Sequence, residues 1–235
     1  MFDQFSFGNT GWGDELLSGL GVTVRLAAAT LPVGLLIGFG VAQLLMARSF
    51  MLRAVGVGYT TLMRGLPEIL TLFMVYNGVG LALKSFSQHF APGGAGFDIS
   101  PFVAGTTALA LVFGAFAAEV IRGGFIAIPR GQIEAGQAIG MSPAQIFWRI
   151  KLPQLWRFAL PGLGNLWLGL LKDTSLVSII AVNDLMRMTK VAVGVTKQPF
   201  TFYLVACAIY WVLCLFSETA LARMERRANR GVARA

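Results

Sequence analysis

Charged residues are scarce in this sequence of 235 residues. Asp, Glu, Lys and Arg together make up only 13% of the chain, whereas 56% of it is hydrophobic and the mean hydropathy is +0.69. Soluble globular domains carry about twice that charged fraction. The composition therefore excludes an ordinary soluble domain and predicts an integral membrane protein. The 28 glycines agree with this prediction, because small residues let transmembrane helices approach one another closely.

Histidine and cysteine are almost as rare. His89 is the single histidine, and Cys207 and Cys214 are the only cysteines. Two soft ligands and one distant histidine make no metal site, and cysteines seven residues apart in one helix are too distant for a disulfide, so we expect them to serve packing. A phosphate-binding GxxxxGK[ST] loop is missing from the sequence, which predicts no ATP hydrolysis, no catalytic residues and no cofactor in this chain. The acidic N-terminal stretch also disfavours a cleaved signal peptide.

Long apolar stretches indicate how the chain crosses the bilayer. A helix needs about 20 predominantly apolar residues to span the hydrocarbon core. Five stretches meet this length, at about residues 22–47, 54–83, 99–121, 158–181 and 200–222. The predicted fold class is an all-α integral membrane protein with five transmembrane helices, forming one domain over residues 1–235. Between the last two spans, Met186–Val193 suggests a short interfacial helix that ends at Gly194.

The distribution of basic residues predicts the orientation of these spans. Five spans place the two termini on opposite sides of the membrane. On one side lie Arg48, Arg53, five basic residues between Arg122 and Arg157, and five in the C-terminal tail, whereas the other side has only four. The positive-inside rule then predicts an external N-terminus and a cytoplasmic C-terminus. The net charge of +8 therefore reflects topology and attraction to anionic lipid, and we expect no nucleic-acid partner.

Ionisable residues interrupt the second and third spans. In the second span, Arg64 and Glu68 are four residues apart and are expected to pair on one helix face, and Pro67 between them is expected to kink the helix. A charge within the bilayer is costly, so these residues either line a pathway or lie near the cytoplasmic end and reach the interface. At the end of the third span, Glu119 and Arg122 are three residues apart and predict an interfacial ion pair.

A third polar cluster lies near the middle of the fourth span. Lys172, Asp173 and Thr174 follow one another there, in the deepest polar position of the sequence. Reaching the interface is least available to residues at this depth, so a functional or inter-helix role is favoured over a purely structural one. An amino acid that crosses a bilayer needs an acidic partner for its ammonium group and donors for its carboxylate. We expect Asp173 to serve the first role and Lys172 or Thr174 the second.

The longest polar segment, from Pro129 to Pro153, predicts two short helices joined by a turn. Pro129 suits the first turn of a helix, and Gly140 is placed to end that helix in a left-handed cap. Ser142 and Gln145 have the spacing of a capping box at the start of the second helix. Pro153 is expected to stop the second helix. Because this elbow lies between spans three and four, the orientation above places it in the cytoplasm.

The elbow carries a resemblance to a known family. Glu134, Ala135 and Gly136, followed by Gly140 and by the run Ile150–Pro153, resemble the EAA loop of bacterial ABC-importer permease subunits, with glycine in place of the usual third alanine. Three longer runs, at residues 58–80, 118–140 and 159–185, resemble polar amino-acid permeases in the same order. The histidine/lysine/arginine/ornithine and opine permeases are the most similar kind.

This resemblance implies a type I ABC importer in a bacterial inner membrane, built of two permease subunits, two ATPases and an external substrate-binding protein. The second permease is expected to be a paralogue, and ATP and Mg are expected on the partner ATPase. Glu134, Ala135, Gly136 and Gly140 would then couple this chain to the ATPase. The charged residues of the spans, which are Arg64, Glu68, Glu119, Arg122, Lys172, Asp173 and Thr174, would form the substrate path or gate.

Two other classes of membrane protein compete with this interpretation. An ion-coupled secondary amino-acid carrier is disfavoured by the small number of spans, by the missing inverted repeat and by a large elbow without a role. A scaffold without transport activity is disfavoured by the polar residues within spans two and four, which are costly unless they are used. Side-chain chemistry leaves open which amino acid or opine is carried and whether the permease dimer contains one chain or two.

Overall fold

The structure of the protein is a computed structural model that describes residues 2–8, 11–79, 81 and 100–229. Within these residues every regular element is helical. The α-helices are α1 (Gly13–Leu45), α2 (Phe50–Gly65), α3 (Glu68–Phe73), α5 (Pro101–Ile126), α6 (Arg130–Ala138), α7 (Pro143–Ile146), α8 (Leu152–Asp173), α9 (Leu185–Thr196) and α10 (Pro199–Ala228). Short 3-10 helices cover Phe2–Phe5 and Thr174–Ile180, and π-helical turns cover Met74–Val79 and Phe147–Lys151. His89 lies outside the described residues.

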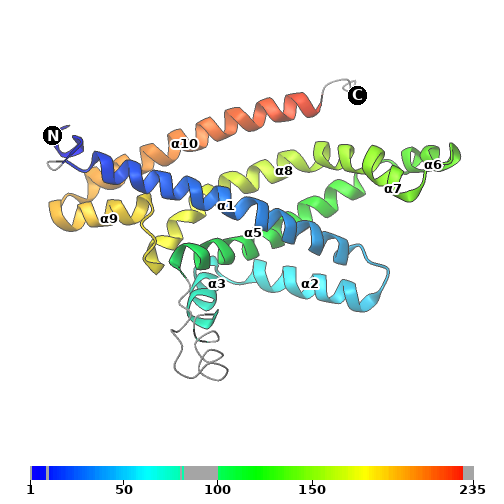
Figure 1. The fold of residues 1–235 in the computed structure, drawn as a ribbon, viewed down its shortest axis with the longest axis horizontal. Helices are drawn as coiled ribbons and strands as arrows, with labels where there is room; N and C mark the ends of the chain where they lie inside the picture. Colours follow the sequence, from blue (N-terminus) through cyan, green and yellow to red (C-terminus); the bar gives the residue numbers. More distant parts are fainter. Residues whose placement is uncertain (1, 9–10, 80, 82–99, 230–235) are drawn as a thin grey trace.

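The long helices run roughly lengthwise through an elongated molecule (Figure 1). Helix α1 packs along α5, α5 packs on α8, and α8 packs on α10. The N-terminus and α9 lie at one end of the molecule, whereas the C-terminus, the α1–α2 connection and the α6–α7 elbow lie at the other (Figure 1). By length and composition, α1, α5 and α10 are the described helices that can cross a membrane. The second and fourth predicted spans are therefore not single apolar helices of this kind.

The second predicted span is divided into two helices. Helix α2 ends at Gly65, Leu66 is extended with ψ of 142°, and α3 begins at Glu68 in a different direction (Figure 1). The residue before a proline is disfavoured in the α region, and Pro67 has no N–H to continue the helix. The prediction of a kink within one helix is therefore wrong, because the helix ends and restarts.

The fourth predicted span has no break at Pro153. The helical path runs on from α7 through the π turn at Phe147–Lys151 into α8, where the proline occupies the first turn. The N–H of Leu152 bonds to the carbonyl of Phe147, five residues back, and this wider turn immediately precedes the proline. The expectation that Pro153 stops the helix is wrong for this reason. Pro129 is likewise the residue before α6, in an extended conformation, and is not in its first turn.

Two further helix boundaries and the environment of one cysteine differ from the sequence-based expectations. Helix α1 begins at Gly13, where Asp14 and Glu15 stabilise a helix N-terminus, so it starts well before residue 22. Helix α9 passes Gly194 and ends at Thr196, and Lys197 takes the left-handed cap with φ of 58°. Both cysteines on α10 are free as expected, but Cys207 is exposed in the described structure, which does not support its predicted packing role.

Small residues set the distance between α1 and α5. Gly34 and Gly38 are buried one turn apart on α1. A Cβ atom at Gly34 would lie 2.6 Å from the ring of Phe113, and one at Gly38 would lie 2.8 Å from the Cβ of Ala117. On α5, Gly114 leaves space for the side chain of Ile37, because a Cβ atom at position 114 would lie 2.7 Å from Cγ2 of Ile37. These contacts are of the small-xxx-small type that holds membrane helices together by close backbone approach.

This packing predicts different effects for two neighbouring glycines. Gly38→Leu should lower the stability of the detergent-extracted protein by about 1–3 kcal/mol, because the added side chain must separate α1 from α5. Gly40→Leu is the matched control, since nothing lies within 4 Å of a Cβ at that position. Thermal unfolding followed by size-exclusion chromatography measures both variants. Equal stability of the two variants would contradict the proposed helix contact.

Candidate functional site

An open cavity of about 250 Å³ lies between α3, α5 and α8. Its polar lining consists of Glu68 from α3 and of Asn165, Lys172 and Asp173 from α8. Its apolar wall comes from α5, through Leu109, Val112, Phe113 and Phe116. The structure thus brings together three of the predicted path residues, Glu68, Lys172 and Asp173, from two segments that are far apart in the sequence.

The local backbone explains how both carboxylates reach the cavity. Glu68 is the first residue of α3, directly after the break at Leu66–Pro67. Asp173 is the last residue of α8, where the chain changes from an α-helix to a 3-10 helix. It therefore lies at the point where the α-helix ends and the 3-10 helix begins. The cavity is thus lined by two carboxylates and one lysine, so its lining carries more acidic than basic groups and accordingly favours a cation.

The donors near this acidic pair differ from those expected. Thr174 is completely buried, and its hydroxyl donates to the carbonyl of Leu171 at 2.7 Å. It does not line the cavity, so its predicted role as a carboxylate donor has no geometric support. Lys172 does line the cavity, together with Asn165, which sequence analysis missed. Asn165, Gly169 and Asp173 are four residues apart on one face of α8, and this spacing of polar and small residues is the signal that would have found it.

A second charged cluster joins α2 to α5. Arg122 donates to Glu119 Oε2 through Nε at 2.9 Å and through Nη2 at 2.7 Å, which confirms the predicted pair. Arg64 Nη1 lies 3.6 Å from Glu119 Oε1, so the predicted pairing of Arg64 with Glu68 is wrong. The helix break between residues 64 and 68 removes the four-residue spacing on which that pairing depended. Glu119 and Arg122 lie on α5, about two turns and one turn respectively before the helix ends at Ile126.

One aromatic ring lies between the cluster and the cavity. The guanidinium carbon of Arg64 lies 5.4 Å from the centre of the Phe116 ring, within the range of a cation–π contact. Phe116 also lines the cavity. The two groups of charges are therefore adjacent and are separated by an apolar side chain.

The elbow has the turn that its sequence predicts. Gly140 adopts φ of 80°, the left-handed conformation expected of it. The N–H of Gly140 bonds to Gln137 O at 3.0 Å and that of Met141 bonds to Gly136 O at 3.0 Å, which together form a Schellman cap. The predicted capping box follows, since Ser142 Oγ accepts from the Gln145 N–H and the Ser142 N–H donates to Gln145 Oε1. These paired caps fix the angle between α6 and α7.

Gly136 has a packing reason to be glycine. It is the one buried residue of α6, and a Cβ there would lie 2.8 Å from Cδ1 of Ile150. Glycine therefore lets α6 lie directly on the π turn that leads into α8. Gln154 Nε2 also donates to Gln132 Oε1 at 2.7 Å and ties α6 to α8.

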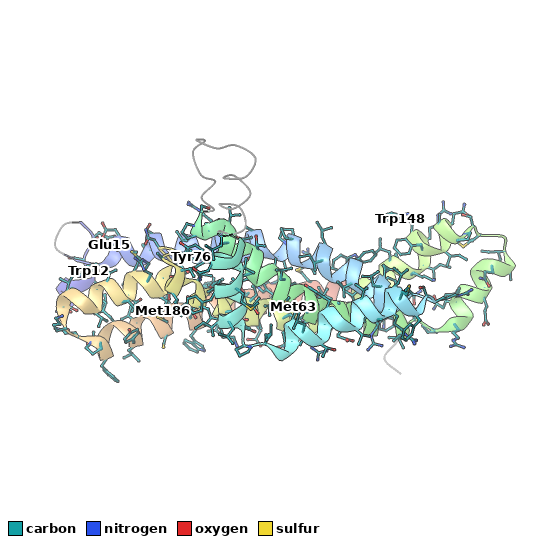
Figure 2. The ribbon with its side chains drawn as sticks, turned by 90° about the horizontal axis from the view of Figure 1, so that it is seen from below. Trp12, Glu15, Met63, Tyr76, Trp148 and Met186 are labelled. Carbon is teal, nitrogen blue, oxygen red and sulfur yellow. The ribbon has the colours of Figure 1, made fainter. Side chains whose placement is uncertain are left out.

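The outer face of the elbow is exposed. Glu134 and Ala135 lie on this face, with no neighbouring element of the described chain covering them. Ile139 is 79% exposed and Trp148 is 66% exposed. Figure 2 shows Trp148 at the end of the molecule opposite Trp12. Two large apolar side chains exposed beside polar groups are typical of an interface with another protein.

Comparison with known proteins identifies the family. The sequence profile described as "Binding-protein-dependent transport system inner membrane component" matches residues 32–230. The chain belongs to this family. It is 44% identical over 226 residues to the arginine ABC transporter permease protein ArtQ of Escherichia coli K12, covering 92% of this chain and 95% of the relative. It is 43% identical to the nopaline transport system permease protein NocQ of Agrobacterium fabrum, covering 96% of each chain.

Solved structures share the fold of this permease. The crystal structure of an amino acid ABC transporter with histidines superimposes with a TM-score of 0.78 at 32% identity, covering 92% of this chain and 95% of that one. The inward-facing MetNI methionine ABC transporter superimposes with a TM-score of 0.68 at 18% identity, which supports the fold alone. These matches confirm the family resemblance noted in the sequence and the type I permease fold. Members of this family are transport components and not enzymes, and membership does not favour the secondary carrier.

Proposed function

We propose that this chain is the permease subunit of an ATP-driven importer for polar, basic L-amino acids or opines. The observation that carries the proposal is the pair of carboxylates, Glu68 and Asp173, in one cavity bounded by three helices. The ammonium and guanidinium groups of a basic amino acid match this acidic pair, and Lys172 and Asn165 supply donors for the substrate carboxylate. The names of two relatives reported above, an arginine permease and a nopaline permease, refer to substrates of this chemical class.

The proposed topology has five spans in a bacterial inner membrane, with the N-terminus outside and the C-terminus in the cytoplasm. Helices α1, α5, α8 and α10 each cross the membrane as one helix. The remaining span, which is the second in chain order, is divided between α2 and α3. In support, the basic segments gather at one end of the molecule, where the α1–α2 connection, the elbow and the C-terminus all lie (Figure 1).

The proposed partners are a second permease, two ATP-binding subunits and an external substrate-binding protein. The second permease is proposed to be a paralogue, and ATP with Mg is proposed to bind to the ATPase. The elbow, with Glu134, Ala135, Gly136 and Gly140, is the proposed contact with the ATPase. Its exposed face of polar and apolar side chains supports this role.

The geometry supports a mechanical route from the elbow to the cavity. The chain is helical without interruption from Pro143 through the π turn and along α8 to Asp173. The preceding helix α5 enters the elbow from its other side and forms the apolar wall of the cavity. A displacement of the elbow by the ATPase would therefore move two walls of the cavity together, and this joint movement is the proposed basis of alternating access.

Co-purification tests the subunit composition. The chain, tagged at its C-terminus and extracted gently from native membranes, should retain a P-loop ATPase in equal stoichiometry. A second permease of similar size should accompany it if the dimer contains two different chains. Mass spectrometry identifies the retained subunits. Recovery of the chain alone, folded and active in uptake, would refute the importer and favour a secondary carrier.

Removing one negative charge from the cavity tests substrate recognition. Asp173→Asn should reduce uptake of a basic amino acid about tenfold or more, because a charge-assisted hydrogen bond contributes about 1.5–3 kcal/mol. Asp14→Asn is the control, since Asp14 is an exposed carboxylate in the first turn of α1, far from the cavity. Uptake of radiolabelled arginine and substrate-stimulated ATP hydrolysis are measured in proteoliposomes. If Asp173→Asn left both unchanged, the cavity would not be the recognition site.

Substitutions in the elbow test coupling. Glu134→Ala and Gly140→Val should assemble in the membrane and yet lose most ATP-driven uptake. The first removes an exposed charge from the proposed contact, and the second strains a left-handed cap by about 1–2 kcal/mol. Glu218→Ala is the control, an exposed carboxylate on α10 away from the elbow. Uptake and retention of the ATPase are compared after purification. Full uptake by both elbow variants would remove the elbow from the mechanism.

A further inference from the structure

Two apolar cavities lie side by side on another part of the molecule. One has a volume of about 380 Å³ and lies between α1, α5 and α8, and the other has a volume of about 450 Å³ and lies between α1, α8 and α10. They share Leu35, Trp156 and Leu163, so together they form one forked groove. Each volume falls in the range of about 300–1,000 Å³ that is typical of small-molecule sites. Neither cavity includes a residue of the acidic site.

Each of the two cavities reaches through only about half of a membrane. Along α8 the smaller cavity extends from Leu152 to Leu163 and the larger from Trp156 to Trp167. At 1.5 Å per residue each of these distances is about 16 Å, roughly half of a hydrocarbon core of about 30 Å. A transmembrane helix of another subunit would occupy the full thickness, whereas the acyl chains of a lipid occupy one leaflet. The dimensions therefore fit a lipid.

Two arginines continue the groove at the end where the elbow lies. Arg157 precedes Leu160 by one turn of α8, and Arg227 follows Met224 by three residues on α10, so each extends a lining face of its helix. Arg157 Nε donates to Asn229 Oδ1 at 2.9 Å, which places its guanidinium beside the C-terminal end of α10. In the part of the chain that the structure describes, no carboxylate pairs with either arginine. Their remaining N–H groups can bind phosphate oxygens.

We propose that this groove binds an anionic phospholipid of the surrounding bilayer. The two acyl chains lie in the two cavities on either side of Trp156, and the headgroup phosphate binds Arg157 and Arg227. An uncharged or zwitterionic lipid gains the same apolar contacts but lacks the net charge, so the arginines give the site its preference for anionic lipid. Because Trp156 lies in the first turns of α8, directly after the π turn, the bound lipid contacts the helix that joins the elbow to the acidic cavity.

Fluorescence quenching by brominated acyl chains tests the proposal. The protein, with the subunits that co-purify, is placed in phosphatidylcholine nanodiscs that contain a small proportion of brominated phosphatidylglycerol or of brominated phosphatidylcholine. The contribution of Trp156 is obtained by difference from the variant Trp156→Phe. Each arginine should raise the preference for the anionic lipid about fivefold. Half-maximal quenching of Trp156 should therefore need about 25-fold less brominated phosphatidylglycerol than brominated phosphatidylcholine.

Three variants separate a built site from ordinary lipid contact. The double variant Arg157→Gln with Arg227→Gln should abolish the difference between the two lipids. Arg226→Gln should preserve it, because position 226 lies on a different face of α10. Ala220→Phe should reduce quenching by both lipids, since Ala220 lines the larger cavity. Equal quenching by the two lipids in the wild-type protein, or a preference that survives the double variant, would overturn the proposal. Absence of quenching by either lipid would show that a protein covers the groove and would overturn it as well.

Discussion

The requirement that backbone N–H and C=O groups find partners inside a hydrocarbon layer governs where this chain departs from α-helix. Departures within the proposed spans occur at Leu66–Pro67, at the π turn Met74–Val79 and at Thr174–Ile180. The π and 3-10 turns keep most backbone hydrogen bonds, so their cost is small. Irregular backbone at membrane depth is tolerated where it is covered by protein or lines a hydrated cavity. The break before Glu68 and the end of α8 at Asp173 both border the same cavity. The breaks and the cavity therefore depend on each other.

The elbow gains its significance from the two helices that it joins. Helix α5 enters it and α8 leaves it, and these helices form two walls of the acidic cavity. The Schellman cap at Gly140 and the buried contact of Gly136 with Ile150 hold α6 firmly on the start of α8. A rigid connection of this kind transmits a displacement, whereas a flexible loop would absorb it. The glycine at position 136 serves the same end, because it permits the closest approach of α6 to the π turn.

Local features of the elbow could be predicted from the sequence, because caps depend on residues within a few positions of one another. The left-handed Gly140 and the capping box at Ser142 are examples. The pairing of Arg64 with Glu119 could not be predicted, since it joins residues 55 positions apart and depends on a helix break whose angle is set by tertiary packing. Continuation of the helix through Pro153 was also beyond sequence reasoning, because the widened turn that accommodates it is stabilised by neighbouring helices. Which side chains line the cavity could not be predicted either, because the packing of distant helices decides it. Thr174, for example, is buried in the interior and does not line the cavity.

The strengths of the contacts around α5 indicate which of its neighbouring helices moves most easily. Helix α1 is interlocked with α5 through the glycines at 34 and 38, and separating them would expose closely packed backbone. Helix α2 contacts α5 through polar groups, which include the hydroxyl of Tyr59 donating to Leu111 O at 2.6 Å, the pair of Arg64 with Glu119 at 3.6 Å and the cation–π contact of Arg64 with Phe116. A neutral hydrogen bond contributes about 1 kcal/mol, and a part-exposed ion pair contributes about 0–1 kcal/mol. Together these are small beside the cost of separating two interlocked helices. Movement of α2 away from α5 therefore costs less than separation of α1 from α5. Helix α3, which carries Glu68, is held more firmly than α2, because Leu72 is only 1% exposed and packs in the same hydrophobic core as Phe113.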